Sequence, residues 1–285
     1  MEYAIEVQGL TKHYPGFTLD HVSFSVPAGS IVGFIGENGA GKSTTIKALL
    51  RLIRPEEGEI SLLGKKDGAA FREIKEQIGA AFDESYFPDN LRIKDVDRIM
   101  RSIFKTWESD KFLSYCRRFE LPGKKTVKEF SRGMKMKLSI AAALSHQTKL
   151  LILDEATSGL DPVVRDEILD MFQEFIQDEA HSVLISSHIT SDLEKVADYI
   201  TFIHKGEIFL SEEKDRIMEE YGIVRCRPED LASIASDMIV GVSRGAYSCD
   251  VLVNQRERVK QQYPDMMVNR IKLEDVLLFK VKGDK

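Results

Sequence analysis

The chain has 285 residues, which is enough for one large domain and a small appendage. Its composition, 43% hydrophobic and 30% charged, is typical of a soluble globular protein. The net charge of -6 at pH 7 provides no overall basic field of the kind that nucleic-acid-binding proteins use.

The distribution of apolar residues excludes two further classes. No uninterrupted apolar stretch approaches the roughly 20 residues that a membrane-spanning helix needs. The N-terminus, MEYAIEVQGL, lacks the positive region and apolar core of a signal peptide. We therefore expect a cytoplasmic protein that meets a membrane only through a partner.

The first 55 residues predict strands, a glycine-rich loop and a helix. Strand-like alternation or short apolar runs occupy three segments: 3–8, 21–26 and 31–35. After a glycine-rich loop, apolar side chains recur at helical spacing from Ile46 to Ile53, until Pro55 ends the pattern. A strand, a glycine loop and a helix in this order are typical of phosphate-binding sites.

Helical patterns dominate the middle of the chain. Phe71, Ile74 and Ile78 share one predicted helical face, and the pattern from 93 to 119 is helical throughout. We therefore predict a helical block between 86 and about 147.

The alternation of strands and helices then resumes. Apolar runs predict strands at 150–153 and 183–186 and a hairpin over 199–210. Between the two strands, Pro162 at a first helical position and Asp161 as its N-cap predict the start of a helix.

The last part of the chain has a different pattern. Beyond residue 222, short β-type runs mix with short helical pieces, which predicts a small α+β appendage over 222–285. The cysteines Cys116, Cys226 and Cys249 lie far apart in the sequence and show no metal-type spacing. We expect three reduced thiols without a chemical role.

The glycine-rich loop carries the strongest functional signal. Its sequence, GENGAGKST, fits the pattern G-x-x-x-x-G-K-[ST]. Glycines let backbone N–H groups form a nest around a phosphate, and the following helix adds its N-terminal dipole. We predict that nine loop residues bind ATP: Gly36, Glu37, Asn38, Gly39, Ala40, Gly41, Lys42, Ser43 and Thr44. The alternative, a surface turn, is disfavoured by the strand before the loop and the helix after it.

Particular side chains of the loop have predicted roles. The Lys42 ammonium reaches the β- and γ-phosphates, and the Ser43 hydroxyl is offered to Mg²⁺.

Asp154 and Glu155 end a buried apolar strand at the edge of the sheet where α/β folds bind ligands. We predict that Asp154 holds Mg²⁺ and that Glu155 polarises a water for attack on the γ-phosphate. The alternative for this pair is a solvated strand end.

With these motifs in order, residues 3 to about 220 resemble the nucleotide-binding domain of ABC transporters. GENGAGKST resembles the family's Walker A motif, LLILDE at 150–155 resembles Walker B, and SGLD at 158–161 resembles the D-loop. FSRGM at 130–134 stands where the family has LSGGQ. The resemblance implies an α/β fold: a P-loop NTPase (RecA-like) core, an N-terminal antiparallel β subdomain and an inserted α-helical subdomain. It also implies an ATPase domain over 1–221, with 222–285 as an accessory domain.

The resemblance implies roles for four more residues. His188 matches the switch histidine that contacts the γ-phosphate, and Tyr14 stands where an aromatic ring stacks on adenine. Ser131 is a natural N-cap, so the helix that it begins exposes its N-terminus to an anion. In the family this anion is the γ-phosphate held by a second subunit, which the Ser131 hydroxyl and the Gly133 N–H contact. Taken alone, Ser131 would be an ordinary helix cap.

The chain departs from the family pattern at two places. Arg132 and Met134 replace the consensus Gly and Gln of the signature, whereas the serine and the second glycine are retained. Asp83 stands where the family has a glutamine at the end of the strand before the helical block. We predict that Asp83 faces Mg²⁺, because a carboxylate near the γ-phosphate needs a cation. The alternative is that Asp83 points to solvent and that Glu84 or a water takes its place.

The function that the resemblance implies is that of an ATP-hydrolysing motor subunit. Two subunits, either two copies or a copy and a paralogue, sandwich ATP. Each ATP lies between the Walker A loop of one subunit and the signature helix of the other subunit. The variant signature is most similar to exporters of drugs, peptides or lantibiotics, whose separately encoded integral membrane permease would place a coupling helix in the groove near 83–105.

Two other functions are open to an ATPase of this kind. A soluble ABC ATPase that acts on ribosomes or DNA usually has two cassettes or a long coiled-coil insert, and this acidic chain has neither. We therefore expect no nucleic-acid partner. A sensor or immunity module with little turnover is disfavoured by the retained Glu155 and His188.

Overall fold

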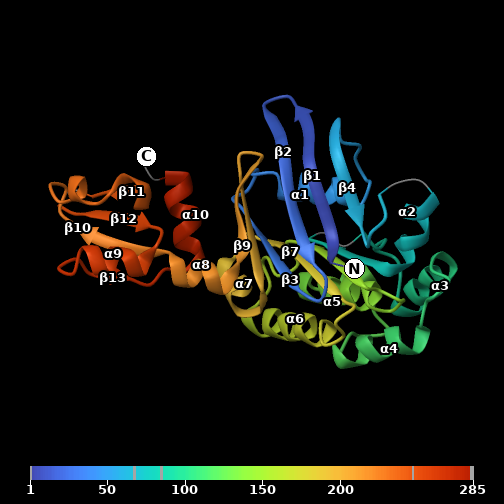
Figure 1. The fold of residues 1–285 in the computed structure, drawn as a ribbon. Helices are drawn as coiled ribbons and strands as arrows, with labels where there is room; N and C mark the ends of the chain where they lie inside the picture. The colour runs from blue at the N-terminus through green and yellow to red at the C-terminus, as the bar shows by residue number, and fades with distance from the viewer. Residues whose placement is uncertain (1, 67–68, 84–85, 246, 283–285) are drawn as a thin grey trace.

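The computed structural model describes residues 2–66, 69–83, 86–245 and 247–282 and contains three sheets (Figure 1). A three-stranded antiparallel sheet comes first, a six-stranded sheet forms the centre, and a four-stranded antiparallel sheet lies near the C-terminus. Within the described residues, no helix is long and apolar enough to cross a membrane.

The N-terminal sheet has the order β2-β1-β4. Its strands are β1 (Tyr3–Tyr14), β2 (Phe17–Pro27) and β4 (Glu57–Leu62). The predicted strands at 3–8 and 21–26 are parts of β1 and β2. One face of this sheet is apolar and packs on the central sheet, where the rings of Phe24 and Phe34 stack with their centroids 5.1 Å apart.

The central sheet has the order β5-β6-β7-β3-β8-β9. Its strands are β3 (Ile31–Ile35), β5 (Ile78–Phe82), β6 (Leu150–Asp154), β7 (Ser182–Ser187), β8 (Tyr199–His204) and β9 (Glu207–Glu213). Neighbours from β5 to β8 are parallel, and β9 returns antiparallel to β8 as the predicted hairpin. Strands β3, β6 and β7 are buried along their whole length, as expected for parallel strands covered on both faces.

Three helices each follow a strand of the central sheet. They are α1 (Lys42–Leu49) after β3, α6 (Pro162–Phe175) after β6 and α7 (Thr190–Val196) after β7. The predicted cap of α6 is confirmed, because the Asp161 side chain accepts a hydrogen bond from the Val164 N–H at 3.0 Å. The predicted extent of α1 is wrong. The helix ends at Leu49 rather than near Ile53, and Arg51 adopts a left-handed conformation with φ of 57°.

The middle of the chain contains α2 (Ala69–Ile74), α3 (Ile93–Ile103), α4 (Ser109–Arg118) and α5 (Arg132–Ala143). Short 3-10 turns at Lys75–Gln77 and Val127–Glu129 separate some of them. Two predictions are wrong here. Ile78 begins β5 instead of continuing a helix, and the segment 93–119 is interrupted between α3 and α4.

The interruption between α3 and α4 has a physical cause. The Glu76 carboxylate accepts hydrogen bonds from the Lys105 and Thr106 N–H groups, at 3.1 and 3.2 Å, and from the Thr106 hydroxyl at 3.0 Å. This carboxylate therefore satisfies backbone donors that a continuous helix would have bonded internally.

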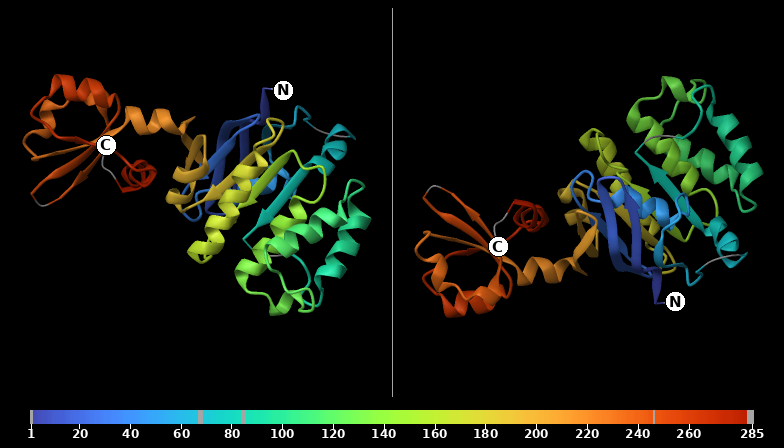
Figure 2. Two further views of the ribbon diagram at one scale, coloured as in Figure 1. Left: turned by 90° about the horizontal axis from the view of Figure 1, so that it is seen from below. Right: turned by 90° about the horizontal axis from the view of Figure 1, so that it is seen from above.

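The C-terminal part has its own sheet, with the order β11-β12-β10-β13. Its elements are β10 (Gly222–Cys226), β11 (Ile239–Arg244), β12 (Cys249–Val253), α9 (Arg256–Gln262), β13 (Val268–Asn269) and α10 (Leu273–Lys282), with 3-10 turns at Leu231–Ser233 and Ser236–Met238. Helix α8 (Lys214–Glu220) leads from the central sheet into this part, which lies to one side of the chain (Figure 2). Cys226 and Cys249 stand opposite each other across β10 and β12, and both are free and buried.

Helix α10 connects the C-terminal part to the rest of the molecule. Leu273 and Val276 are buried and belong to the same apolar cluster as the central sheet and α7. The Leu273 N–H donates to the Glu194 carboxylate at 2.6 Å, and the Lys280 ammonium lies 5.2 Å from the ring centroid of Phe209. The last helix of the chain therefore packs on the central part, although its own sheet has a separate core.

We expect Leu273→Ala to lower the free energy of unfolding by about 2–5 kcal/mol, because Leu273 is fully buried where α10 meets the central core. Leu278→Ala on the same helix is the matched control. Leu278 is 38% exposed, so its truncation should change stability by less than about 0.5 kcal/mol. Thermal and urea unfolding of the two variants would measure this difference, and equal midpoints would contradict the packing of α10.

Candidate functional site

The loop between β3 and α1 has a backbone that requires glycine at several positions. Gly39 and Gly41 have φ values of 83° and 115°, in the left-handed region that side chains disfavour. At Gly36 the reason is close approach, because an added Cβ would stand 2.6 Å from the Ile203 carbonyl oxygen on β8. The loop is thus tightly folded against the sheet, and α1 begins directly behind it at Lys42.

The Lys42 side chain lies in the middle of this loop and is 5% exposed. Its ammonium donates to the carbonyl oxygens of Gly36 and Glu37 at 2.7 and 3.2 Å. It also forms an ion pair with Glu155, at 3.1 Å from Oε1. A buried cation between a helix N-terminus and glycine turns is the arrangement that cradles a phosphate chain.

The end of β6 brings two carboxylates to the same place. Asp154 is 6% exposed, and its Oδ1 accepts a hydrogen bond from the Ser186 hydroxyl on β7 at 2.6 Å. The next residue, Glu155, has φ of 53°, so the chain turns sharply there. Its N–H donates to the carbonyl and the hydroxyl oxygens of Ser186, both at 3.1 Å. Ser186 therefore fixes both acidic residues.

The Glu155 carboxylate connects Lys42 to His188. Oε1 faces the Lys42 ammonium, whereas Oε2 lies 2.6 Å from His188 Nδ1. The Glu155 side chain is 14% exposed and that of His188 is 41% exposed. The structure thus brings together the lysine of the loop, the strand-end glutamate and the histidine after β7, although they are remote in the sequence.

The oxygen donors present here fit Mg²⁺ better than a metal that needs a cage of side chains. Among residues 2–66, 69–83, 86–245 and 247–282, no group of three His, Cys, Asp or Glu side chains could hold a metal ion. Mg²⁺ is usually held by one or two carboxylates together with phosphate oxygens and waters. One buried carboxylate, that of Asp154, and the Ser43 hydroxyl in the loop suit that mode.

The predicted signature residues lie at the start of α5. Ser131 is its N-cap, as predicted, because the Ser131 hydroxyl accepts from the Met134 N–H at 3.2 Å. An added Cβ on Gly133 would stand 3.4 Å from Val164 Cγ1 on α6.

Tyr14, at the end of β1, is 40% exposed and has the Lys12 ammonium 5.8 Å from its ring centroid. None of these contacts involves the loop 36–44.

Asp83 follows β5 and forms an ion pair with Arg132, the first residue of α5. Its predicted role as a Mg²⁺ ligand stays a prediction. The alternative that names Glu84 falls outside the described residues.

The structure adds His204 and Asp192, which the sequence patterns did not indicate, to the surroundings of the loop and of His188. Glu37 Oε1 of the loop lies 3.0 Å from Nδ1 of His204, which ends β8. Buried Asp192, on α7 beyond His188, lies 3.7 Å from Arg165 Nε on α6, and burial raises the pKa of its carboxyl group. These contacts join segments that are distant in sequence, so no local motif could indicate them.

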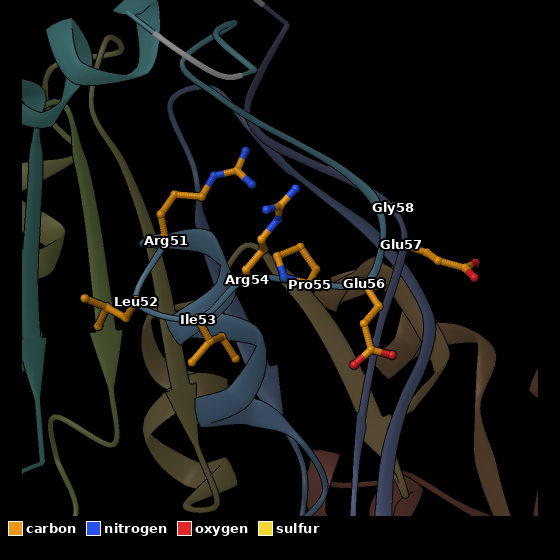
Figure 3. Close-up of a pocket in the computed structure, with 8 residues that line it drawn as sticks. All are labelled: Arg51, Leu52, Ile53, Arg54, Pro55, Glu56, Glu57 and Gly58. Atoms are coloured by element: carbon orange, nitrogen blue, oxygen red, sulfur yellow. The ribbon is translucent and has the colours of Figure 1, made fainter.

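A separate hollow of about 690 Å³ lies beyond the other end of α1. It is lined by residues 51–58, and Figure 3 shows the Arg51 and Arg54 side chains extending in a similar direction beside it. Because α1 begins at the glycine loop and ends before this hollow, the hollow is not part of the site formed by Lys42 and Glu155.

Comparisons with known proteins agree with this geometry. The family model described as ABC transporter matches residues 19–158. The bacitracin transport ATP-binding protein BcrA of Bacillus licheniformis is 37% identical over 212 residues, which cover 73% of this chain and 69% of that protein. The lantibiotic transport ATP-binding protein SrtF of Streptococcus pyogenes is 37% identical over 214 residues, which cover 74% of this chain and 91% of that protein.

Solved structures give the same result for the fold. An ATP-binding subunit of an ABC transporter superposes with a TM-score of 0.68 at 28% identity, covering 75% of this chain and 91% of that one. A dimeric ATP-binding cassette bound to ADP and Pi has a TM-score of 0.66 at 20% identity. The match covers 73% of this chain and 98% of that chain. The predicted fold class, a P-loop NTPase core with an antiparallel β subdomain and a helical insertion, is confirmed. The chain belongs to the family of ABC transporter ATP-binding proteins, and it is therefore a nucleotide-binding ATPase of a transporter.

Proposed function

We propose that this chain hydrolyses MgATP as the motor subunit of an exporter, in a dimer with a second copy or a paralogue. It would act at the cytoplasmic face of the membrane through a separately encoded integral membrane permease. The observation that carries the chemistry is the convergence of Lys42, Glu155 and His188, with contacts of 3.1 and 2.6 Å. The assignment to export is supported by the names of the bacitracin and lantibiotic transport relatives.

In this proposal the glycine loop, residues 36–44, holds the phosphates and Lys42 reaches the β- and γ-phosphates. Ser43 and Asp154 would hold Mg²⁺, which when bound neutralises charge on the phosphate oxygens. Tyr14 would stack on adenine. Ser131 and Gly133 would present the N-terminus of α5 to the nucleotide of the partner subunit, since helix N-termini attract anions.

The Glu155 carboxylate is the proposed general base. Its Oε1 is occupied by an ion pair with the Lys42 ammonium at 3.1 Å. A γ-phosphate in the loop would compete with Glu155 for the Lys42 ammonium. Glu155 would then keep its contact with His188, which orients the carboxylate toward a water that attacks the γ-phosphate.

A groove between the central sheet and the helical block is the proposed docking place for the permease. An apolar hollow of about 250 Å³ lies there, lined by residues of β5, α3 and α5 that include Phe82, Met100 and Ala142. Tyr86, which also lines the hollow, is 71% exposed, and Ile103 at the end of α3 is 59% exposed. A short amphipathic helix on the cytoplasmic side of the permease fits such a surface, because it could bury these side chains.

We expect Glu155→Gln to keep MgATP binding, to lower turnover by at least about 100-fold and to accumulate an ATP-bound dimer, because the amide cannot accept the proton. Single-turnover hydrolysis and size-exclusion chromatography with ATP would measure both effects. Glu174→Gln is the control, since Glu174 pairs with Arg118 at an exposed site. Wild-type turnover in Glu155→Gln would show that another group is the base.

We expect Lys42→Ala to abolish nucleotide binding or hydrolysis while the chain stays folded, because the variant lacks the buried ammonium of the loop. Lys47→Ala, at an exposed position on the same helix, should bind and hydrolyse ATP normally. Fluorescent-nucleotide titration with circular dichroism would test this. Unchanged affinity and turnover in a folded Lys42→Ala protein would end the assignment of the loop.

We also propose that 1–221 forms the ATPase domain and 222–285 an accessory domain. Because every residue with a proposed chemical role precedes residue 189, a chain that ends at Tyr221 should hydrolyse ATP. Its thermal midpoint should fall, since Leu273 and Val276 no longer cover the central core. A soluble truncated chain without hydrolysis would refute the separation.

A further inference from the structure

Arg132 and Asp83, two departures from the family pattern, meet in the structure. Arg132 is the first residue of α5 and donates a hydrogen bond from Nη2 to Oδ1 of Asp83, which follows the last residue of β5. The side chains are 48% and 45% exposed. This ion pair therefore connects the helical block to the carboxyl edge of the central sheet.

A third segment completes the surroundings of the Arg132 guanidinium. Gly159 lies in the turn between β6 and α6 and has φ of 66°. A Cβ added there would collide with Arg132, since it would stand 2.8 Å from Cζ and closer still to Nη1. The guanidinium thus occupies space that exists only because residue 159 has no side chain.

The position of Arg132 in the sequence means that its contacts affect the first turn of α5. Arg132 lies between Ser131, the N-cap of α5, and Gly133, which packs near Val164 of α6. A guanidinium that is bonded to a carboxylate on one side and lies against a glycine turn on another restricts how the first turn of α5 is oriented. The Ser131 hydroxyl and the Gly133 N–H belong to that turn.

We propose that Arg132 is a positioning residue: held by Asp83 and seated over Gly159, it orients the first turn of α5 toward the nucleotide of the partner subunit. This inference rests on the proposed function of that turn. It also gives Asp83 a cation within its own chain, so that its charge near the phosphates is compensated by Arg132 and not by Mg²⁺. Direct donation from Arg132 to the partner's nucleotide is the competing role.

The test is a double-mutant cycle on the full-length chain, with Asp83→Asn, Arg132→Gln and the double variant. The pair is about half exposed, so its loss should leave the unfolding midpoint nearly unchanged. Each single variant should lower kcat/KM for MgATP by about 3- to 10-fold, and the double variant should be no worse than the singles, because both changes remove one interaction. Arg132→Lys should recover part of the loss.

Lys135→Gln is the matched control. Lys135 also lies on α5 and forms an ion pair with Asp89 at 3.3 Å, but both residues belong to the helical block. Its removal should leave kcat/KM within about 2-fold of wild type, as expected for an exposed pair. Raising the salt concentration should lower the kcat/KM of the wild type toward that of the double variant. The kcat/KM of the double variant should depend less on salt.

Three results would overturn the inference. Multiplicative losses in the double variant would show that the two residues act independently. Tighter nucleotide binding in Asp83→Asn, with weaker binding in Arg132→Gln, would assign Arg132 to the phosphate directly. A smaller gain of ATP affinity from Mg²⁺ in Asp83→Asn than in wild type would make Asp83 a metal ligand. An error in the proposed function itself would appear separately, because Lys42→Ala would then bind and hydrolyse nucleotide normally.

Discussion

The site depends on the register of four parallel strands. Phe82 of β5 pairs with Asp154 of β6, and Asp154 and Phe34 each pair with Ser186 of β7, so all four strands end at one level. Asp83, Glu155, His188 and the glycine loop each follow one of these strands. A slip of one residue in any pair would turn its side chains to the opposite face and remove its functional group from the site. The buried strands thus position the chemical groups and also form the core.

Conformational strain at this edge is balanced by hydrogen bonds. A left-handed glutamate such as Glu155 costs on the order of 1–3 kcal/mol and persists only where its surroundings compensate that cost. Ser186 does so, because its carbonyl and hydroxyl accept from the Glu155 N–H while its hydroxyl donates to Asp154. The turn directs the Glu155 carboxylate toward Lys42 and His188 instead of along the strand. A buried serine on the neighbouring strand is therefore as necessary to the geometry as the carboxylates.

Local patterns predicted the parts of the fold that depend on local interactions. The strand 31–35, the N-caps Ser131 and Asp161, and the loop between β3 and α1 follow from residues a few positions apart. The break between α3 and α4 could not be predicted, because it depends on Glu76, which lies outside the segment 93–119 whose periodicity predicted the helix. The same applies to the contacts of His204 with Glu37 and of Arg132 with Asp83. In each case a tertiary contact decides the outcome, and periodicity carries no information about it.

The turn between β6 and α6 links the proposed base to the helical block over a short stretch of chain. It begins at Glu155, whose carbonyl accepts from the Ser158 N–H at 3.0 Å, and it passes beneath the Arg132 guanidinium at Gly159. Leu160 then packs near Gly133, and Asp161 caps α6. The first turn of α5 therefore contacts a turn whose first residue carries the Glu155 carboxylate.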